Sequence, residues 1–158
     1  MIKLKELILA ILICQLAGVI GSFFTFDSIP NWYSDIIKPD FTPPEWIFGP
    51  VWIGPYTLMG ISLYWIYISK NKERKNALFI FGIQLVLNAL WSIIFFGFNS
   101  IILGLLIILL LWISIILTII KFYSINKNSG LILIPYLLWV SFATVLNYFI
   151  FILNWWFQ

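Results

Sequence analysis

Residues 101–120 read IILGLLIILLLWISIILTII, twenty consecutive positions without a charged side chain. A helix needs roughly 20 apolar residues to cross the hydrocarbon core of a bilayer, so this run is long enough for one transmembrane span. Its side chains are almost all Ile and Leu. We expect such a helix to face lipid or to serve only as structure.

Four more stretches are similarly apolar and also lack charge: residues 7–26, 46–69, 77–98 and 131–153. The chain of 158 residues is 63% hydrophobic and 9% charged, whereas a soluble domain carries about 25% charged residues. These figures predict an all-α polytopic membrane protein, in which residues 1–158 form a single transmembrane domain built as a five-helix bundle. The five spans use most of the chain and leave no room for a soluble domain.

The charged residues are divided unequally between the two ends of the predicted spans. One end has eight basic and two acidic residues, and the other has one basic and four acidic residues, so the ends carry +6 and −3. Cytoplasmic loops are enriched in Lys and Arg, which predicts a cytoplasmic amino terminus and an external carboxyl terminus. No helix-turn-helix or RNA-binding signature accompanies the basic residues, so we expect no nucleic-acid partner.

The connection between the first two spans, residues 27–44, is much longer than the others. Loops of this length are usually functional or disordered, and its prolines restrict the backbone, so we expect an ordered lid over the outer end of the bundle. A plain interfacial anchor is the alternative, because Trp and Tyr favour the headgroup region. In the second span, Pro50 and Pro55 each remove a helical hydrogen bond, which predicts a kinked helix with space beside it.

Three spans each carry a stripe of aromatic and amide side chains. Gln84, Asn88 and Trp91 are spaced i, i+4, i+7, which places them on one helix face. The other two stripes are Trp52, Tyr56 and Met59 in span two, and Tyr136, Trp139, Ala143 and Asn147 in the last span. Amides at bilayer depth need partners, so these side chains either join helices or line a ligand pocket. Three aligned stripes favour an apolar, aromatic pocket with a few hydrogen-bond donors, suited to a flat hydrophobic ligand.

Several kinds of chemistry lack the residues that they need. The chain has no histidine, so histidine-based catalysis and haem ligation are not available, and no metal site is predicted. No carboxylate lies within a predicted span, so a buried relay of acids is not available either. The sequence therefore predicts no required cofactor.

Three motifs together resemble the tryptophan-rich sensory protein and translocator protein family, which includes the peripheral-type benzodiazepine receptor. They are WYSDIIKPDFTPPEWIFGPVW at 32–52, QLVLNALWSIIFF at 84–96 and PYLLWVSFATVLNYFIFILN at 135–154. The resemblance covers the chain from about Trp32 to Asn154. The sequence departs from the family at Pro55, where Leu is usual, and in the fourth span, which lacks the acid that the family often has there.

The resemblance implies a five-helix bundle, commonly dimeric, whose pocket opens toward the first loop. It implies binding of porphyrins or haem-like tetrapyrroles and of isoquinoline and benzodiazepine-type ligands, with the membrane lipid as surroundings. The family's pocket positions correspond here to Tyr33, Pro43, Trp52, Asn88, Trp91, Trp139 and Ala143. The helical stripes add Gln84 and Asn147 to the predicted ligand-binding residues.

We therefore predict a binding protein for tetrapyrroles and other flat aromatic ligands in a bacterial-type cytoplasmic membrane, with a role in tetrapyrrole sensing, transport or regulation. The ligand is expected to enter under the first loop and to lie between Trp52 and Trp139, with Asn88 donating a hydrogen bond to it. An enzyme for light-dependent porphyrin degradation is the first alternative, with Trp52 and Trp139 as the reactive partners. A transporter of tetrapyrroles or sterols is the second, although the sequence shows no inverted repeat.

Overall fold

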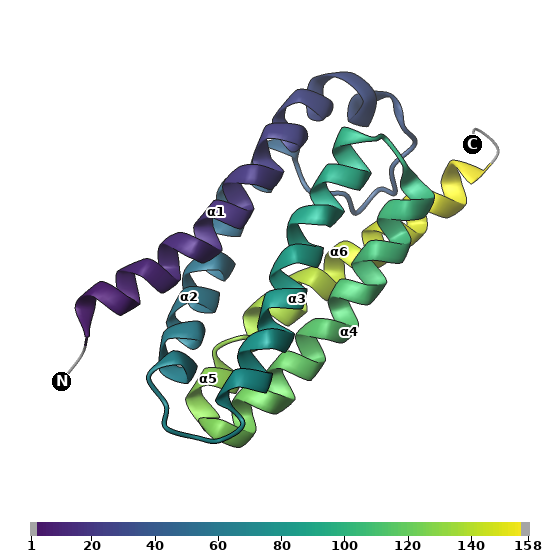
Figure 1. The fold of residues 1–158 in the computed structure, drawn as a ribbon. Helices are drawn as coiled ribbons and strands as arrows, with labels where there is room; N and C mark the ends of the chain where they lie inside the picture. Colours follow the sequence, from purple (N-terminus) through teal and green to yellow (C-terminus); the bar gives the residue numbers. More distant parts are fainter. Residues whose placement is uncertain (1–2, 156–158) are drawn as a thin grey trace.

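The computed structural model describes residues 3–155, and this part of the chain is helical apart from short connections (Figure 1). The α-helices are α1 (Leu4–Ser28), α2 (Ile53–Tyr67), α3 (Arg74–Ser92), α4 (Ile101–Ile125), α5 (Lys127–Leu131) and α6 (Ile134–Leu153). Single π-helical turns extend α1 through Ile29–Tyr33 and α3 through Ile93–Gly97, and two 3₁₀ turns, Glu45–Phe48 and Pro50–Trp52, precede α2. The predicted all-α class is confirmed.

Within residues 3–155, four of the helical rods are long and apolar enough to cross a membrane: Leu4–Tyr33, Arg74–Gly97, Ile101–Ile125 and Lys127–Leu153. The fifth predicted span differs, because α2 has only 15 residues. The two 3₁₀ turns before it supply the missing length, since such turns rise about 2.0 Å per residue compared with 1.5 Å in an α-helix. The bundle therefore has five rods, the second of which begins irregularly.

In the bundle, α1 packs against α2 and α3, and α4 packs against α3 and α6 (Figure 1). Close contact between α1 and α2 depends on Gly60, where a Cβ atom would lie 2.5 Å from the Cα atom of Ile11. Helices without a hydrophobic driving force between them associate through such close backbone approaches. The core contains Ile108, Leu111 and Ile115 of α4, all of which are almost completely buried.

The first connection is shorter than predicted, because the helical conformation that begins with α1 continues to residue 35. Polar residues in 27–35 predicted a loop, but they bond to the backbone of their own helix. The Nδ2 of Asn31 donates to the carbonyl of Asp27 at 2.8 Å, and the hydroxyl of Ser34 donates to the carbonyl of Asn31 at 2.6 Å. We use the term lid below for residues 36–44, the part of the predicted segment that is not helical.

The lid is attached to two parts of the bundle, the end of α6 and the end of the α1 rod. Asn154 at the end of α6 accepts a hydrogen bond from the backbone nitrogen of Ile37 at 3.0 Å and donates one to the Ile37 carbonyl at 2.8 Å. Near α1, the ammonium of Lys38 donates to the carbonyl of Tyr33 at 2.6 Å. The ring of Phe41 packs on Phe149 of α6 with a centroid distance of 5.4 Å. The lid thus covers the α6 side of the bundle.

The prolines of the second rod stand at its beginning rather than in its middle. Pro50 is the first residue of a 3₁₀ turn, and Pro55 lies in the first turn of α2. Backbone nitrogens in a first turn have no intrahelical partner, so proline costs little there. The predicted mid-helix kink is therefore wrong, and an irregular helix start takes its place.

The last connection was also predicted too long. The predicted spans 101–120 and 131–153 leave ten residues between them, but α4 runs to Ile125 and α5 starts at Lys127, with Asn126 alone between them. The Asn126 side chain accepts hydrogen bonds from the backbone nitrogens of Asn128 and Ser129 and so caps α5. An Asn at this position starts a new helix directly after the previous one ends.

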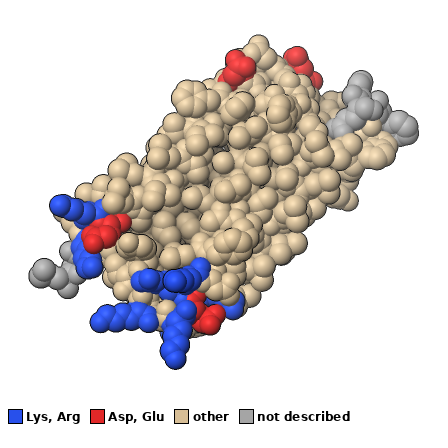
Figure 2. Space-filling model, viewed as in Figure 1, with Lys and Arg blue, Asp and Glu red and all other residues tan. Residues whose placement is uncertain are grey.

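The charges are gathered at the ends of the bundle. Figure 2 shows lysine and arginine side chains at the end where α1 begins, with acidic side chains among them, and further acidic side chains at the opposite end, with an uncharged surface between the two ends. That surface includes many exposed large apolar side chains, such as Phe23, Phe79 and Leu138. An apolar band between two charged ends fits a bilayer.

Candidate functional site

A cavity of about 360 Å³ lies between α1, the irregular start of the second rod and α3. Its walls are mainly apolar. They are formed by residues of three segments, which are Gln15, Gly18, Val19, Gly21, Ser22, Thr25 and Phe26 from α1; Phe48, Gly49, Pro50, Trp52, Ile53 and Tyr56 from the second rod; and Asn88, Trp91, Ser92 and Phe96 from the third. Ligand pockets commonly measure about 300–1,000 Å³, so this cavity is of the size that takes a small ligand.

The cavity opens on the flank of the bundle and not beneath the lid. Val19, Phe26 and Ile53 belong to its walls and are also 48%, 62% and 60% exposed on the outer surface. These side chains lie in the apolar band, so the opening faces lipid. No residue from 34 to 47 lines the cavity, which places the lid away from it.

Tryptophan rings form one wall. The indole of Trp52 lies 6.2 Å from that of Trp91 between centroids, and Trp91 stacks on Phe95 at 5.8 Å with an interplanar angle of 18°. The indole nitrogen of Trp91 donates to the amide oxygen of Asn147 at 3.4 Å, which fixes the ring from behind. The aromatic rings that face the cavity are therefore fixed in orientation by the residues packed against them.

Trp139 lies behind this wall. Its ring meets that of Trp52 edge to face at 6.3 Å, and it does not line the cavity. The expected arrangement with a ligand between these two rings is therefore not the one observed, because the rings contact each other directly. The buried Nε1 of Trp139 has no hydrogen-bond partner within residues 3–155.

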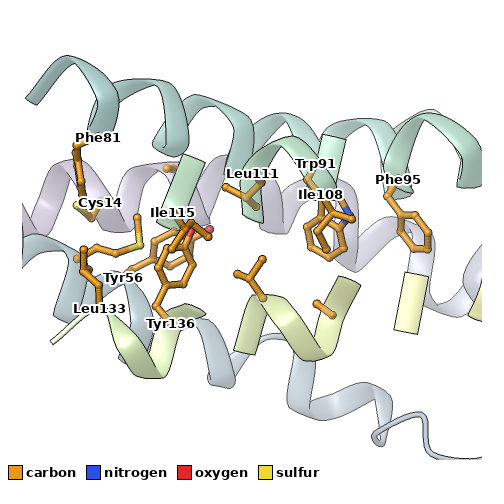
Figure 3. Packing of buried hydrophobic residues seen from close by; sticks show 14 of the residues in the cluster. Cys14, Tyr56, Phe81, Trp91, Phe95, Ile108, Leu111, Ile115, Leu133 and Tyr136 are labelled. Atoms are coloured by element: carbon orange, nitrogen blue, oxygen red, sulfur yellow. The ribbon is translucent and has the colours of Figure 1, made fainter. Parts of the chain in front are cut away.

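A chain of polar side chains runs from the cavity into the bundle. The hydroxyl of Tyr56 donates to the Asn88 amide oxygen, and the Asn88 amide nitrogen donates to the Tyr136 hydroxyl at 2.9 Å. That hydroxyl donates in turn to the amide oxygen of Gln84 at 3.0 Å. Figure 3 shows Tyr56 and Tyr136 side by side in the core, with Trp91 further along the bundle. The three predicted stripes thus meet, through hydrogen bonds that join α2, α3 and α6.

The predicted ligand-binding residues fall into two groups. Trp52, Asn88 and Trp91 line the cavity. The others pack around it or lie apart from its walls; these are Tyr33, Pro43, Gln84, Trp139, Ala143 and Asn147. Gln84, Ala143 and Asn147 are buried. Asn147 bonds to Trp91 and to the Ala143 carbonyl, and Gln84 bonds to Tyr136, so these residues support the side chains that line the cavity.

Tyr33 and Pro43 lie toward the outer end of the bundle. Tyr33 is buried, with its ring against Phe48 at 5.8 Å and Phe96 at 5.5 Å. Because Phe48 and Phe96 both line the cavity, Tyr33 supports its outer end. Pro43 is half-buried in the lid.

The predicted ligand-binding residues include none from α1, which supplies the largest share of the walls. The four positions Gln15, Gly18, Ser22 and Thr25 are spaced i, i+3, i+7 and i+10, so small and polar residues share one helix face. This spacing was visible in the sequence. It was missed because only aromatic and amide residues at the other spans were matched to a pocket.

The walls contributed by α1 and α3 are joined by hydroxyl groups. The Ser92 hydroxyl donates to the carbonyl of Gly21 at 2.9 Å, and it lies 2.7 Å from the hydroxyl of Thr25. The amide nitrogen of Gln15 donates to the carbonyl of Ile53 at 3.2 Å and to the Thr57 hydroxyl at 3.0 Å. Most polar groups of the walls are therefore bonded within the protein.

Comparison with known proteins identifies the family. The model of the TspO/MBR family matches residues 10–153. Tryptophan-rich protein TspO of Archaeoglobus fulgidus is 46% identical over 154 residues, which cover 96% of this chain and 99% of that protein. Protein CrtK of Rhodobacter capsulatus is 36% identical over 89% of this chain and 88% of its own. The translocator protein of Homo sapiens is 33% identical over 85% of this chain and 81% of its own. This chain therefore belongs to the TspO/MBR family and is an integral membrane protein.

Proposed function

We propose that this protein binds flat, hydrophobic aromatic ligands, including porphyrins and other tetrapyrroles and isoquinoline or benzodiazepine-type compounds. The observation that carries the proposal is the cavity whose walls include Trp52, Trp91 and Asn88 together. Aromatic faces stack on a flat ligand, and an amide at the wall gives the ligand one directed hydrogen bond. The names of the relatives, a sensory protein and a translocator protein, are consistent with a protein that recognises small molecules.

Asn88 is the residue that orients the ligand in this proposal. Its amide oxygen is bonded to Tyr56 and one of its N–H groups to Tyr136, so one N–H group remains for a ligand carbonyl or carboxylate. Lys38, the basic residue of the lid, is engaged elsewhere, because it bonds to the Tyr33 carbonyl and lies 3.7 Å from Glu45. We therefore assign ligand orientation to Asn88 and not to Lys38.

The position of the opening specifies how a ligand arrives. Because the cavity opens at Val19, Phe26 and Ile53, we propose that the ligand enters from the lipid phase. An isoquinoline-type ring system fits within the cavity, and we expect the larger porphyrin to extend through the opening. With the basic end cytoplasmic, the cavity lies toward the outer side of a bacterial-type cytoplasmic membrane.

A titration with protoporphyrin IX, followed by quenching of tryptophan fluorescence in nanodiscs, tests this function. Replacing Trp52 with Leu removes a stacking face, worth about 0.5–1.5 kcal/mol beyond its buried area, so we expect affinity to fall about tenfold. Trp46→Leu is the matched control, because Trp46 is 73% exposed and does not line the cavity. Equal affinities for parent and Trp52→Leu, with both folded by circular dichroism, would refute the proposed site.

Light-dependent porphyrin degradation is the second candidate. The observation that favours it is a set of indoles in contact, in which Trp52 touches both Trp91 and Trp139. Such an array can pass an electron from a ring at the cavity to one behind it. Loss of porphyrin absorbance in aerobic light, measured for the parent and for Trp139→Phe, separates the two functions. Binding alone predicts equal rates, whereas catalysis predicts a slower rate in the variant with unchanged affinity.

A further inference from the structure

The opening of the cavity toward lipid, through which we propose that aromatic ligands enter, is also open to the lipid molecules themselves. Val19 of α1 and Ile53 of α2 stand at the opening and are both cavity walls and lipid-facing side chains. Behind them, Tyr56, Asn88 and Trp91 are 5%, 2% and 7% exposed and form the inner wall. The apolar space therefore continues from the bilayer into the bundle.

The polar groups of the walls offer little to water. The hydroxyl of Ser22 donates to the Val19 carbonyl at 2.7 Å, and that of Ser92 donates to the Gly21 carbonyl. The Tyr56 hydroxyl donates to Asn88, and the indole N–H of Trp91 is directed to Asn147. Water enters a cavity when it finds two to four polar partners, and apolar cavities stay dry and take apolar molecules.

We infer that an acyl chain of a surrounding phospholipid occupies this cavity when no aromatic ligand is bound. The bilayer supplies acyl chains at high concentration along the flank where the cavity opens. A flexible hydrocarbon chain can pass Val19 and Ile53 while its headgroup stays at the membrane surface. Phe26, near the acidic end, marks the leaflet from which the chain enters.

The inference goes beyond ligand binding, because it makes the membrane lipid a competitor at the same site. An aromatic ligand must displace the chain before it can stack on Trp52 and Trp91. Its apparent affinity then depends on the acyl composition of the bilayer. A second consequence is that the cavity is never empty. An empty cavity would be unfavourable, because its wall atoms would lack dispersion contacts on one side.

Photo-crosslinking tests the inference on the unaltered protein. The protein is placed in nanodiscs of phosphatidylcholine that carries a diazirine in its acyl chain, and labelled residues are mapped by mass spectrometry after illumination. We expect label on the inner-wall residues Tyr56, Asn88 or Trp91, in addition to label on lipid-facing residues such as Phe23. Label confined to outward-facing residues would overturn the inference, because the inner wall cannot be reached from the surface.

Two variants provide a matched comparison at the opening. Val19→Phe adds a ring at the mouth of the cavity, whereas Ile20→Phe adds one at a neighbouring exposed position that does not line it. We expect inner-wall labelling to fall at least threefold in Val19→Phe and to stay at the parent level in Ile20→Phe. Equal inner-wall labelling in both variants would show that the chain does not pass this opening.

Protoporphyrin IX in the same experiment separates this inference from the proposed function. Inner-wall label that decreases on adding the porphyrin supports both. Inner-wall label in a protein that does not bind the porphyrin supports the lipid site and overturns the proposed function. Porphyrin binding without inner-wall label leaves the proposed function standing and overturns the lipid site.

Discussion

The two flanks of the bundle differ in how they are filled. On the flank of α3, α4 and α6, Ile108, Leu111 and Ile115 are at most 1% exposed and the side chains fill the space between the rods. On the flank of α1 and α2, the same depth of the bundle contains the cavity. Two regular helices can pack along their whole length, but α2 starts only after two 3₁₀ turns. The hollow therefore follows from an irregular helix start, and the prolines Pro50 and Pro55 contribute to it there.

This comparison suggests that stability and ligand binding are assigned to different flanks. Close-packed interiors lose stability when atoms are removed, because the cavity that remains is not refilled. A wall that already borders a hollow has less contact to lose. Substitutions on the two sides are expected to differ in size and in what they affect.

The largest expected effect is on the filled flank. Leu111→Ala removes a completely buried side chain of α4 and is expected to lower the free energy of unfolding by about 2–5 kcal/mol. Val19→Ala, at the cavity opening, is expected to change it by less than about 1 kcal/mol, since surface positions are usually tolerant. Thermal melting in the same detergent measures both. Equal losses would show that the hollow flank is as tightly packed as the other.

A smaller effect is expected for the polar chain that connects the two flanks. Asn88→Leu leaves the Tyr56 hydroxyl without its acceptor, whereas the Tyr136 hydroxyl keeps its bond to Gln84, and a buried group left unsatisfied costs about 1–3 kcal/mol. The same variant loses the N–H group that we assign to the ligand. Binding of an isoquinoline carboxamide should therefore weaken by more than the lower stability of Asn88→Leu accounts for. Ser114→Ala, which removes a hydroxyl that bonds only to the Leu111 carbonyl, is the control. An unchanged ligand affinity in folded Asn88→Leu would remove Asn88 from the site.

The sequence was sufficient for the filled flank and less so for the hollow one. The predominance of Ile and Leu and the absence of charge in residues 101–120 predict α4 directly, because length and hydropathy determine a membrane helix. The helical stripes also placed Trp52, Asn88 and Trp91 together correctly. Spacing within a helix determines which residues share a face, so such a stripe can be predicted without knowing which helices pack beside it.

The remaining features depend on contacts between segments. The direct contact of Trp52 with Trp139 depends on how the 3₁₀ turns position Trp52, and no local pattern predicts it. The helical continuation to residue 35 depends on side-chain bonds of Asn31 and Ser34, residues that equally favour a loop. The role of α1 depends on which helices pack beside it.

The lid provides a further test, since it covers the α6 side and not the cavity. Asn154→Ala removes two hydrogen bonds to the backbone of Ile37, each worth about 0.5–1.5 kcal/mol. Hydrogen exchange at the Ile37 amide should accelerate by about one order of magnitude, because its acceptor is lost. Porphyrin affinity should remain within about twofold of the parent. A large loss of affinity would show that ligands reach the cavity beneath the lid after all.

The smallest expected effect concerns the ion pair at the lid, where Lys38 lies 3.7 Å from Glu45. Their side chains are 22% and 43% exposed, and exposed ion pairs contribute about 0–1 kcal/mol. A double-mutant cycle with Lys38→Met and Glu45→Gln, measured by thermal melting, should therefore give a coupling energy in this range that decreases as salt is added. The single variant Lys38→Met should cost more than the coupling, because it also removes the hydrogen bond to the Tyr33 carbonyl at 2.6 Å. If the coupling energy equals the whole loss in Lys38→Met, the ion pair and not the hydrogen bond to Tyr33 holds the lid near α1. The lid would then be attached by charge on the α1 side and by neutral amide hydrogen bonds at Asn154.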